Sequence, residues 1–216
     1  MIELLQHCSL RRCIDIRPVP TQQQRVNRIG TVGTNLRPVG ICILTGGLSA
    51  RMGRDKSRLR LGGRSLVGHV RTTAKTLGWP VRVIRRDQVK RCGPLGGICT
   101  ALQTSRAEVE IFLACDMPFV SAGLLQKLVQ SLRQRRSAAF VSRNGLVGFP
   151  FALRRETLPV VEEQIRRKIF SLQSLAAILS ARELRRSARQ AMELFNINTE
   201  DDWTRARSMY AEIHGP

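Results

Sequence analysis

The 216-residue chain has the length of one ordinary domain, and a hydrophobic content of 43% is enough to fill a globular core. Its 36 Lys and Arg residues against 16 Asp and Glu give a net charge of +20, which favours anionic ligands or partners unless it only reflects a genome rich in Arg codons. Aromatic residues make up only 5% of the chain, which argues against binding of nucleic acid by base stacking.

The N-terminal residues 1–37 carry prolines and a Gln run and show little hydrophobic periodicity. We expect a disordered extension there, followed by one folded domain over residues 38–216. A regulatory tail, an organelle address and a mistaken gene start explain the extension equally well. No apolar run approaches the roughly 20 residues that cross a membrane, and no secretory signal is present, so we expect a cytoplasmic protein. The six cysteines form no zinc-binding pattern.

The most informative stretch covers residues 41–56 and reads ICILTGGLSARMGRDK. Its four leading apolar residues suit a strand that is buried on both faces. The paired glycines Gly46 and Gly47 let backbone N–H groups approach phosphate oxygens, and Arg51 and Lys56 add positive charge. The spacing differs from both the Walker A and the dinucleotide-binding patterns. We expect a loop that binds a triphosphate.

A hairpin, a helix and a strand are expected next. Residues 57–63 alternate apolar and polar side chains, which suits a short hairpin, and Ser65 can cap a helix after it. A strand over residues 81–84 then delivers Asp87 at its carboxyl end. The run CGPLGGI over residues 92–98 predicts a tight turn that leads into a helix. Such a turn offers N–H groups to an anion or a base edge, although a purely structural turn would also explain the Gly-Pro pair.

Asp116 follows a buried strand that is predicted over residues 111–114. A carboxylate in this place suits Mg²⁺, which is bound by one or two carboxylates together with phosphate oxygens. Ligands of open α/β sheets collect at the carboxyl ends of strands, where Asp116 would meet the first loop. Capping of the next helix is the alternative role of this residue, because Asp is a strong cap.

The remainder of the chain is predicted to alternate helices and strands. Ser121 and Thr199 can each cap a helix, and Asn144-Gly145 is a hairpin turn signal. The other predicted elements are strands over 138–142, 149–153 and 192–197 and helices over 156–167 and 171–179. This order predicts an α/β protein with three α/β/α layers and a mainly parallel, Rossmann-like sheet, in which the hairpin is the antiparallel element.

Four of these segments resemble motifs of the molybdenum cofactor guanylyltransferases, within the nucleotidyltransferase superfamily. The first is similar to L-A-G-G-x-S-x-R-M-G-x-D-K, with Thr45 in place of alanine. The others resemble G-P-L-[AG]-G, C-D-M-P-F and N-I-N-T-P-E-D, the last with Glu200 in place of proline. The resemblance covers residues 40 to about 205 and implies a fold of the nucleotide-diphospho-sugar transferase type.

The resemblance also implies an activity, namely transfer of GMP from GTP to molybdenum-loaded molybdopterin, with pyrophosphate as the second product. It implies Mg²⁺ as cofactor, GTP and molybdopterin as partners, and transient contact with molybdopterin-handling proteins or apo-molybdoenzymes. The implied catalytic residues are Arg51, Lys56 and Asp116, and Asp116 is the implied metal ligand. The implied nucleotide-binding residues are Leu44, Thr45, Gly46, Gly47, Lys56, Asp87, Pro94, Leu95, Gly96, Gly97 and Asp116.

Two alternatives remain open. One is a cytidylyltransferase or sugar-phosphate nucleotidyltransferase of the same superfamily, and the other is a non-catalytic basic relative that binds nucleotide or RNA. Relatives that use CTP or sugar phosphates commonly show L-A-A-G and D-Q-P, where this chain has Gly46-Gly47 and Asp116-Met117-Pro118. The segment over residues 79–93 is shorter than in the family, as if a strand and its loop were missing, which bears on base selectivity and activity. Asn198 either touches the metal or phosphates or belongs only to a helix cap.

Overall fold

A computed structural model describes residues 38–45, 59–85, 92–132 and 136–215. The extension expected over residues 1–37 lies outside the described residues, as do residues 46–58, which include the rest of the first motif, and residues 86–91. The described residues all fall within one compact unit, Arg37–Pro216.

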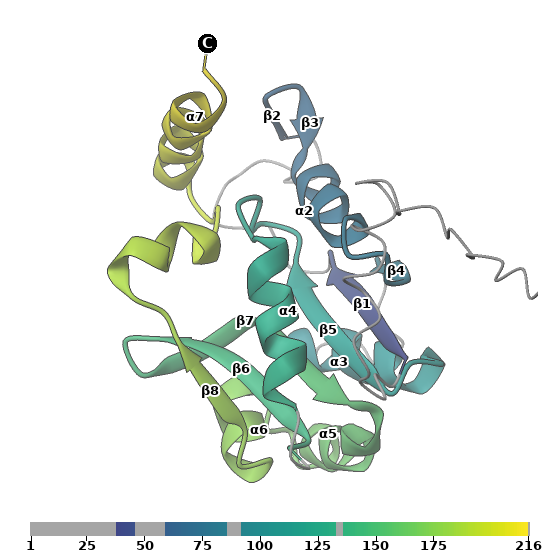
Figure 1. Ribbon diagram of the computed structural model, residues 1–216. Coiled ribbons are helices and arrows are strands. Elements are labelled where there is room, and N and C mark those ends of the chain that lie inside the picture. The colour runs from purple at the N-terminus through teal and green to yellow at the C-terminus, as the bar shows by residue number, and fades with distance from the viewer. Residues whose placement is uncertain (1–37, 46–58, 86–91, 133–135, 216) are drawn as a thin grey trace, which may run out of the picture. The chain divides into compact units, whose positions relative to one another are not determined.

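A six-stranded mixed sheet forms the centre of this unit (Figure 1). Its strand order is β4-β1-β5-β7-β6-β8, and β7 is antiparallel to its two neighbours while the other strands share one direction. The strands are β1 (Val39–Leu44), β4 (Val81–Ile84), β5 (Val109–Ala114), β6 (Ala138–Arg143), β7 (Leu146–Arg154) and β8 (Arg182–Arg185). The mainly parallel sheet predicted from the sequence is confirmed.

Helices cover both faces of the sheet, because the interior strand β1 is apolar on both. Ile41 and Ile43 pack in one core cluster with residues of α2 (Leu66–Lys75) and α4 (Ala122–Ser131). Cys42 and Leu44 pack in another with residues of α3 (Pro94–Thr104), α5 (Leu158–Arg166) and α6 (Leu172–Ile178). All six residues of β1 are buried, as expected for a strand between two helical layers. The three-layer α/β/α architecture is therefore confirmed.

The helices are α2 (Leu66–Lys75), α3 (Pro94–Thr104), α4 (Ala122–Ser131), α5 (Leu158–Arg166), α6 (Leu172–Ile178) and α7 (Glu200–His214), with short 3₁₀ helices η4 (Arg155–Thr157) and η5 (Ala188–Leu194). None of the helices in the described part of the chain combines the length and the apolar composition needed to cross a membrane.

Local side-chain chemistry explains where three of these helices begin. The hydroxyl oxygens of Ser65 and Ser121 each accept the backbone N–H three residues further on, at 3.1 and 3.2 Å. Thr199 accepts the N–H of Asp202 at 3.1 Å in the same way and starts α7. Each bond satisfies an N–H group that has no partner within the helix. The three predicted caps are confirmed.

β6 and β7 form the predicted hairpin. Asn144 and Gly145 have φ angles of 52° and 76°, and this left-handed conformation at both positions is what a two-residue turn of this kind requires. The hairpin is the antiparallel element that the sequence predicted.

The strand predicted over residues 192–197 is wrong. Residues 192–194 end η5, which has a capping box of Ser187 and Gln190 at its start, and residues 195–197 form neither helix nor strand. The last strand is instead β8, which lies at the sheet edge and pairs with β6. Its sequence RELR is largely exposed, so it lacks the apolar alternation by which strands are predicted.

A third, smaller core joins α7 to the hairpin of β2 (Arg60–Leu61) and β3 (Arg64–Ser65). Leu61 and Ile197 are buried in it, and Tyr210 of α7 packs against it. Gly62, in the turn of the hairpin, has a φ of +52°, and the Tyr210 ring occupies the space that a Cβ would need. α7 therefore holds the first element that the structure describes after the first motif (Figure 1).

β4 is the outermost strand on its side of the described sheet. Residues 85–93 separate it from α3, and residues 86–91 of this link lie outside the described residues. The described part of the chain places no further strand between β4 and α3, and the short segment over residues 79–93 stays a prediction.

Candidate active site

The end of β1 is tied to β4 by the residue that departs from the family motif. Thr45 follows β1 directly, and both its N–H and its hydroxyl donate to the carbonyl oxygen of Ile84, at 3.0 and 2.9 Å. Alanine, the usual residue of the motif, could not make the second bond. Thr45 therefore adds a side-chain hydrogen bond to β4 directly after the end of β1.

Asp116 lies at the end of the neighbouring strand β5. The Cys115 N–H donates to the carbonyl oxygen of Leu44 at 3.2 Å, which places the turn that contains Asp116 beside the start of the first motif. The Asp116 residue is half-buried. The next helix, α4, is capped by Ser121, so the capping role considered for Asp116 is wrong.

The loop over residues 196–199 approaches the same point from the C-terminal part of the chain. The Ile197 N–H donates to the carbonyl oxygen of Asp116 at 3.0 Å, and the Ile197 side chain is fully buried. The carboxylate of Asp202 accepts the two N–H groups just before α7, both at 3.0 Å. Burial acts to raise the pKa of Asp202, but these bonds and the Thr199 hydroxyl outweigh it and lower that pKa. The cap of α7 thus fixes this loop against Asp116.

The turn predicted over residues 92–98 is already helical from Pro94 onward. Gly93 is the N-cap residue and has a φ of 54°, a conformation that favours glycine, and Pro94 takes the first helical position. Gly96 and Gly97 therefore lie buried in α3 and not in a loop, which corrects the prediction. The first turn of a helix has N–H groups without partners inside the helix, so the start of α3 suits an anion or a base edge.

The described parts of the predicted nucleotide site meet at the carboxyl edge of β4, β1 and β5. Leu95 in the first turn of α3 packs in the same core cluster as Leu44, and Ile84 packs against that cluster. Arg82 of β4 donates to a carbonyl oxygen in the last turns of α3 at 3.0 Å, so α3 runs back along the sheet from this edge. The structure therefore brings the end of β1, the start of α3 and Asp116 together, where open α/β sheets bind ligands.

Five predicted site residues lie outside the described residues, namely Gly46, Gly47, Arg51, Lys56 and Asp87. Gly46 and Gly47 come directly after Thr45, Arg51 and Lys56 come later in the first motif, and Asp87 follows the end of β4. Their roles therefore stay predictions.

A group of ring side chains near this edge received no role in the sequence predictions. His69 of α2 contacts Tyr210 of α7 edge-on, with ring centroids 5.5 Å apart, and Tyr210 stacks on His214 at 4.1 Å. No local pattern signals such a group, because α2 and α7 come together only in the folded chain.

Comparison with known proteins identifies the family. The profile of the MobA-like NTP transferase domain matches residues 41–188. A probable molybdenum cofactor guanylyltransferase of Opitutus terrae is 29% identical over 202 residues, which cover 83% of this chain and all of that protein. The molybdenum cofactor guanylyltransferase of Pseudomonas entomophila is 31% identical over 149 residues, 61% of this chain and 78% of that protein.

The fold is also similar to that of solved structures. The crystal structure of molybdopterin-guanine dinucleotide biosynthesis protein A from Archaeoglobus fulgidus superposes with a TM-score of 0.62 at 20% identity, over 80% of this chain and 99% of that one. Since the family profile spans more than half of the chain, the chain belongs to the MobA-like NTP transferase domain family.

Proposed function

We propose that this protein transfers GMP from GTP to molybdenum-loaded molybdopterin, forming the guanine dinucleotide of the cofactor and pyrophosphate. Two of its relatives carry the name of this activity, and the family profile covers the sheet from β1 to β8. The observation that carries the proposal is the meeting of the end of β1, the start of α3 and Asp116 at one edge of the sheet.

We assign the triphosphate of GTP to the segment that follows β1 in the chain. Backbone N–H groups of Gly46 and Gly47 would hold its oxygens, and Arg51 and Lys56 would neutralise the α-phosphate and the leaving pyrophosphate. Support for this assignment comes from Thr45, the last described residue before this segment, which is fixed by two hydrogen bonds to β4.

The guanine base belongs to the start of α3. Pro94 has no N–H group, so the N–H groups at this helix start that lack a partner within the helix are those of Gly93, Leu95 and Gly96, and these are available to a base edge. Asp87, in the link that precedes α3, is the carboxylate that we assign to nucleotide binding beside them.

Mg²⁺ fits this edge through Asp116. The described residues contain no group of three or more His, Cys, Asp or Glu side chains that could hold a metal by themselves. Mg²⁺ does not need such a group, because one or two carboxylates and the substrate phosphates usually bind it. When bound, the ion supplies positive charge that stabilises the phosphate oxygens.

The chemistry is a displacement at the α-phosphorus of GTP. An oxygen of the acceptor phosphate forms the new P–O bond while the bond to pyrophosphate breaks, so the protein needs no nucleophile of its own. The chain contributes by positioning. The Ile197 N–H holds the turn of Asp116 in place, and the two Thr45 bonds hold the end of β1 from which the phosphate loop departs.

The location, the domain organisation and the partners of the protein are part of the same proposal. The protein would act in the cytoplasm as a single domain over residues 38–216, preceded by the N-terminal extension. Molybdopterin-handling proteins or apo-molybdoenzymes would contact it transiently to deliver the acceptor or take up the product.

Calorimetric titration of the full chain with GTP, CTP, ATP and UTP, each with Mg²⁺ present, tests this proposal. We expect selective binding of GTP that Lys56→Ala abolishes and that Arg207→Gln, which removes an exposed charge on α7, leaves unchanged. A preference for CTP would favour a cytidylyltransferase. Failure to bind any nucleotide would contradict the proposal, and steeply salt-dependent RNA binding without pyrophosphate release would favour the non-catalytic alternative.

A further inference from the structure

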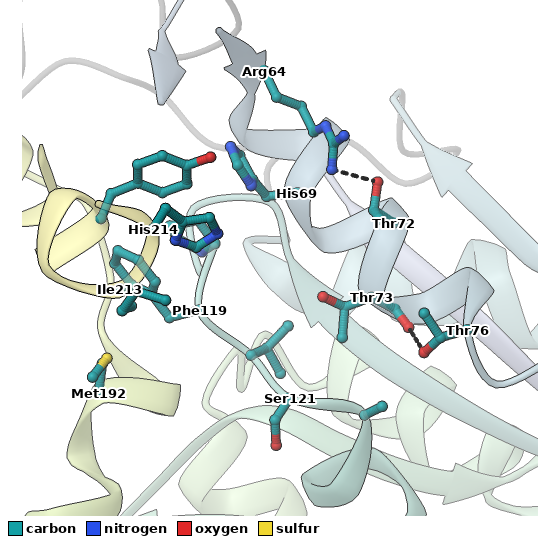
Figure 2. Close-up of a pocket in the computed structure, with 14 residues that line it drawn as sticks. Arg64, His69, Thr72, Thr73, Thr76, Phe119, Ser121, Met192, Ile213 and His214 are labelled. Atoms are coloured by element: carbon teal, nitrogen blue, oxygen red, sulfur yellow. Dashed lines mark hydrogen bonds between the residues drawn. The ribbon is translucent and has the colours of Figure 1, made fainter. Parts of the chain in front are cut away.

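A cavity of about 480 Å³ lies between α2, α7 and the segment over residues 118–122 (Figure 2). This volume is within the range of roughly 300–1,000 Å³ that is typical of small-molecule sites. α2 and α4 cover one face of the sheet, whereas α3, which we assign to the nucleotide, covers the other. The cavity therefore lies on the side of the sheet opposite to α3.

The polar lining of this cavity suits an anion. It comprises the cation Arg64, the histidines His69 and His214, and the hydroxyl groups of three threonines, Ser121 and Tyr210. None of the described residues that line the cavity is an Asp or a Glu. The hydroxyls of Ser121 and Thr76 already donate to Glu193 and to the Thr73 carbonyl oxygen. An anion would therefore be bound mainly by Arg64 and the remaining polar groups, and charge-assisted hydrogen bonds are among the strongest polar contacts.

The apolar lining suits a flat body. The rings of Tyr210 and His214 are stacked, with an angle of 15° between their planes, and Phe119 lies in the same wall. Met192 and Ile213 line the cavity although they are 42% and 49% exposed. Large apolar side chains gain from being covered, and a planar group can stack on the ring pair while it covers them.

Contacts within the protein hold the walls of the cavity in place without a ligand. A ring nitrogen of His69 lies 2.7 Å from the carbonyl oxygen of Leu61, and Arg64 donates to the hydroxyl of Thr72 at 3.2 Å. Tyr210 is seated over Gly62, where no Cβ would fit. A cavity that is formed in advance spares the ligand the cost of ordering its walls.

We propose that this cavity is a binding site for a small anionic compound with a planar apolar body, separate from the site of GTP. The anionic group lies near Arg64, and the planar body lies on the Tyr210 and His214 rings. The proposal stands on the cavity alone and does not depend on the proposed guanylyltransferase activity.

The test compares two fluorescent dyes in the presence of excess GTP, which keeps the nucleotide site from taking up the dye. 8-Anilinonaphthalene-1-sulfonate carries the anionic group and a planar body, and N-phenyl-1-naphthylamine is its neutral analogue. We expect the anionic dye to bind roughly tenfold more tightly than the neutral one. Arg64→Gln should weaken binding of the anionic dye roughly five- to tenfold and leave the neutral dye within about twofold.

Arg207→Gln is the matched control, because it removes the same charge from an exposed position of α7 that does not line the cavity. His214→Gln is the second variant, and it should weaken both dyes because it removes the stacked ring. Equal affinity for the two dyes, an equal effect of Arg64→Gln and Arg207→Gln, or binding of the anionic dye that is seen without GTP but lost in excess GTP would each overturn the proposal.

Discussion

Replacement of Arg82 by methionine should destabilise the protein by about 3 kcal/mol at pH 8. Arg82 donates to the carboxylate of Glu110 at 2.8 Å, and the Glu110 side chain is only 1% exposed. Coulomb's law gives about 6 kcal/mol for two charges at this distance with an effective dielectric constant of about 20. The net loss is smaller, because Arg82 is 32% exposed and Ser105 also donates to Glu110.

The size of this effect should depend on pH. Burial raises the pKa of Glu110, while the Ser105 hydrogen bond and the Arg82 charge lower it in part. Without Arg82 the pKa in the folded protein rises further above the value in the unfolded chain. The folded variant then binds a proton more readily than the unfolded one, so its stability recovers as pH falls from 8 towards 5 and is lost again as pH rises through the folded pKa.

Urea denaturation of the wild type, Arg82→Met and the double variant Arg82→Met/Glu110→Gln at pH 8 and pH 5 measures both effects. The double variant should regain about 1–2 kcal/mol over Arg82→Met at pH 8, because it no longer buries an uncompensated charge. A loss below about 1 kcal/mol at pH 8, or an equal loss at both pH values, would refute the reasoning.

Three further predictions follow from single positions. Gly62→Ala should cost at least about 1 kcal/mol more than Gly63→Ala in urea denaturation, because both have positive φ but only the first Cβ overlaps Tyr210; equal costs would contradict this. Thr199→Ala should cost about 1 kcal/mol and lower the thermal midpoint by roughly 2–4 °C, since it removes the cap of α7, and an unchanged midpoint would speak against the cap. Burial, with a smaller part from a nearby glutamate, raises the pKa of Cys42 to about 12, so iodoacetamide at pH 8 should leave it unmodified in the folded protein, as mass spectrometry can show.

Local chemistry accounts for what the sequence predicted well. Ser65, Ser121 and Thr199 cap helices through bonds that span three residues, so the pattern is visible within one short segment. The Asn144-Gly145 turn depends on two adjacent residues that tolerate positive φ. The strand β1 was recognisable because it is buried on both faces and is therefore apolar throughout.

Contacts between distant segments account for what the sequence did not show. β8 is held as an edge strand by its pairing with β6, and its own residues carry no strand pattern. Arg82 and Glu110 are 28 positions apart and meet because β4 and β5 both flank β1. Tyr210 reaches His69 only because α7 packs on the hairpin before α2. The candidate nucleotide site was suggested by the motif resemblance. Five of its residues lie outside the described part of the chain, namely Asp87 and the four that come after Thr45 in the first motif.

Transfer of label from GTP to molybdenum-loaded molybdopterin tests the central claim most directly. With GTP labelled at the α-phosphate, the label should enter the dinucleotide product, whereas label at the γ-phosphate should appear only in pyrophosphate. Asp116→Asn should slow the transfer by at least roughly 100-fold while the thermal midpoint stays within about 2 °C of the wild type. No transfer by the wild-type protein, or near-normal transfer by Asp116→Asn, would contradict the account.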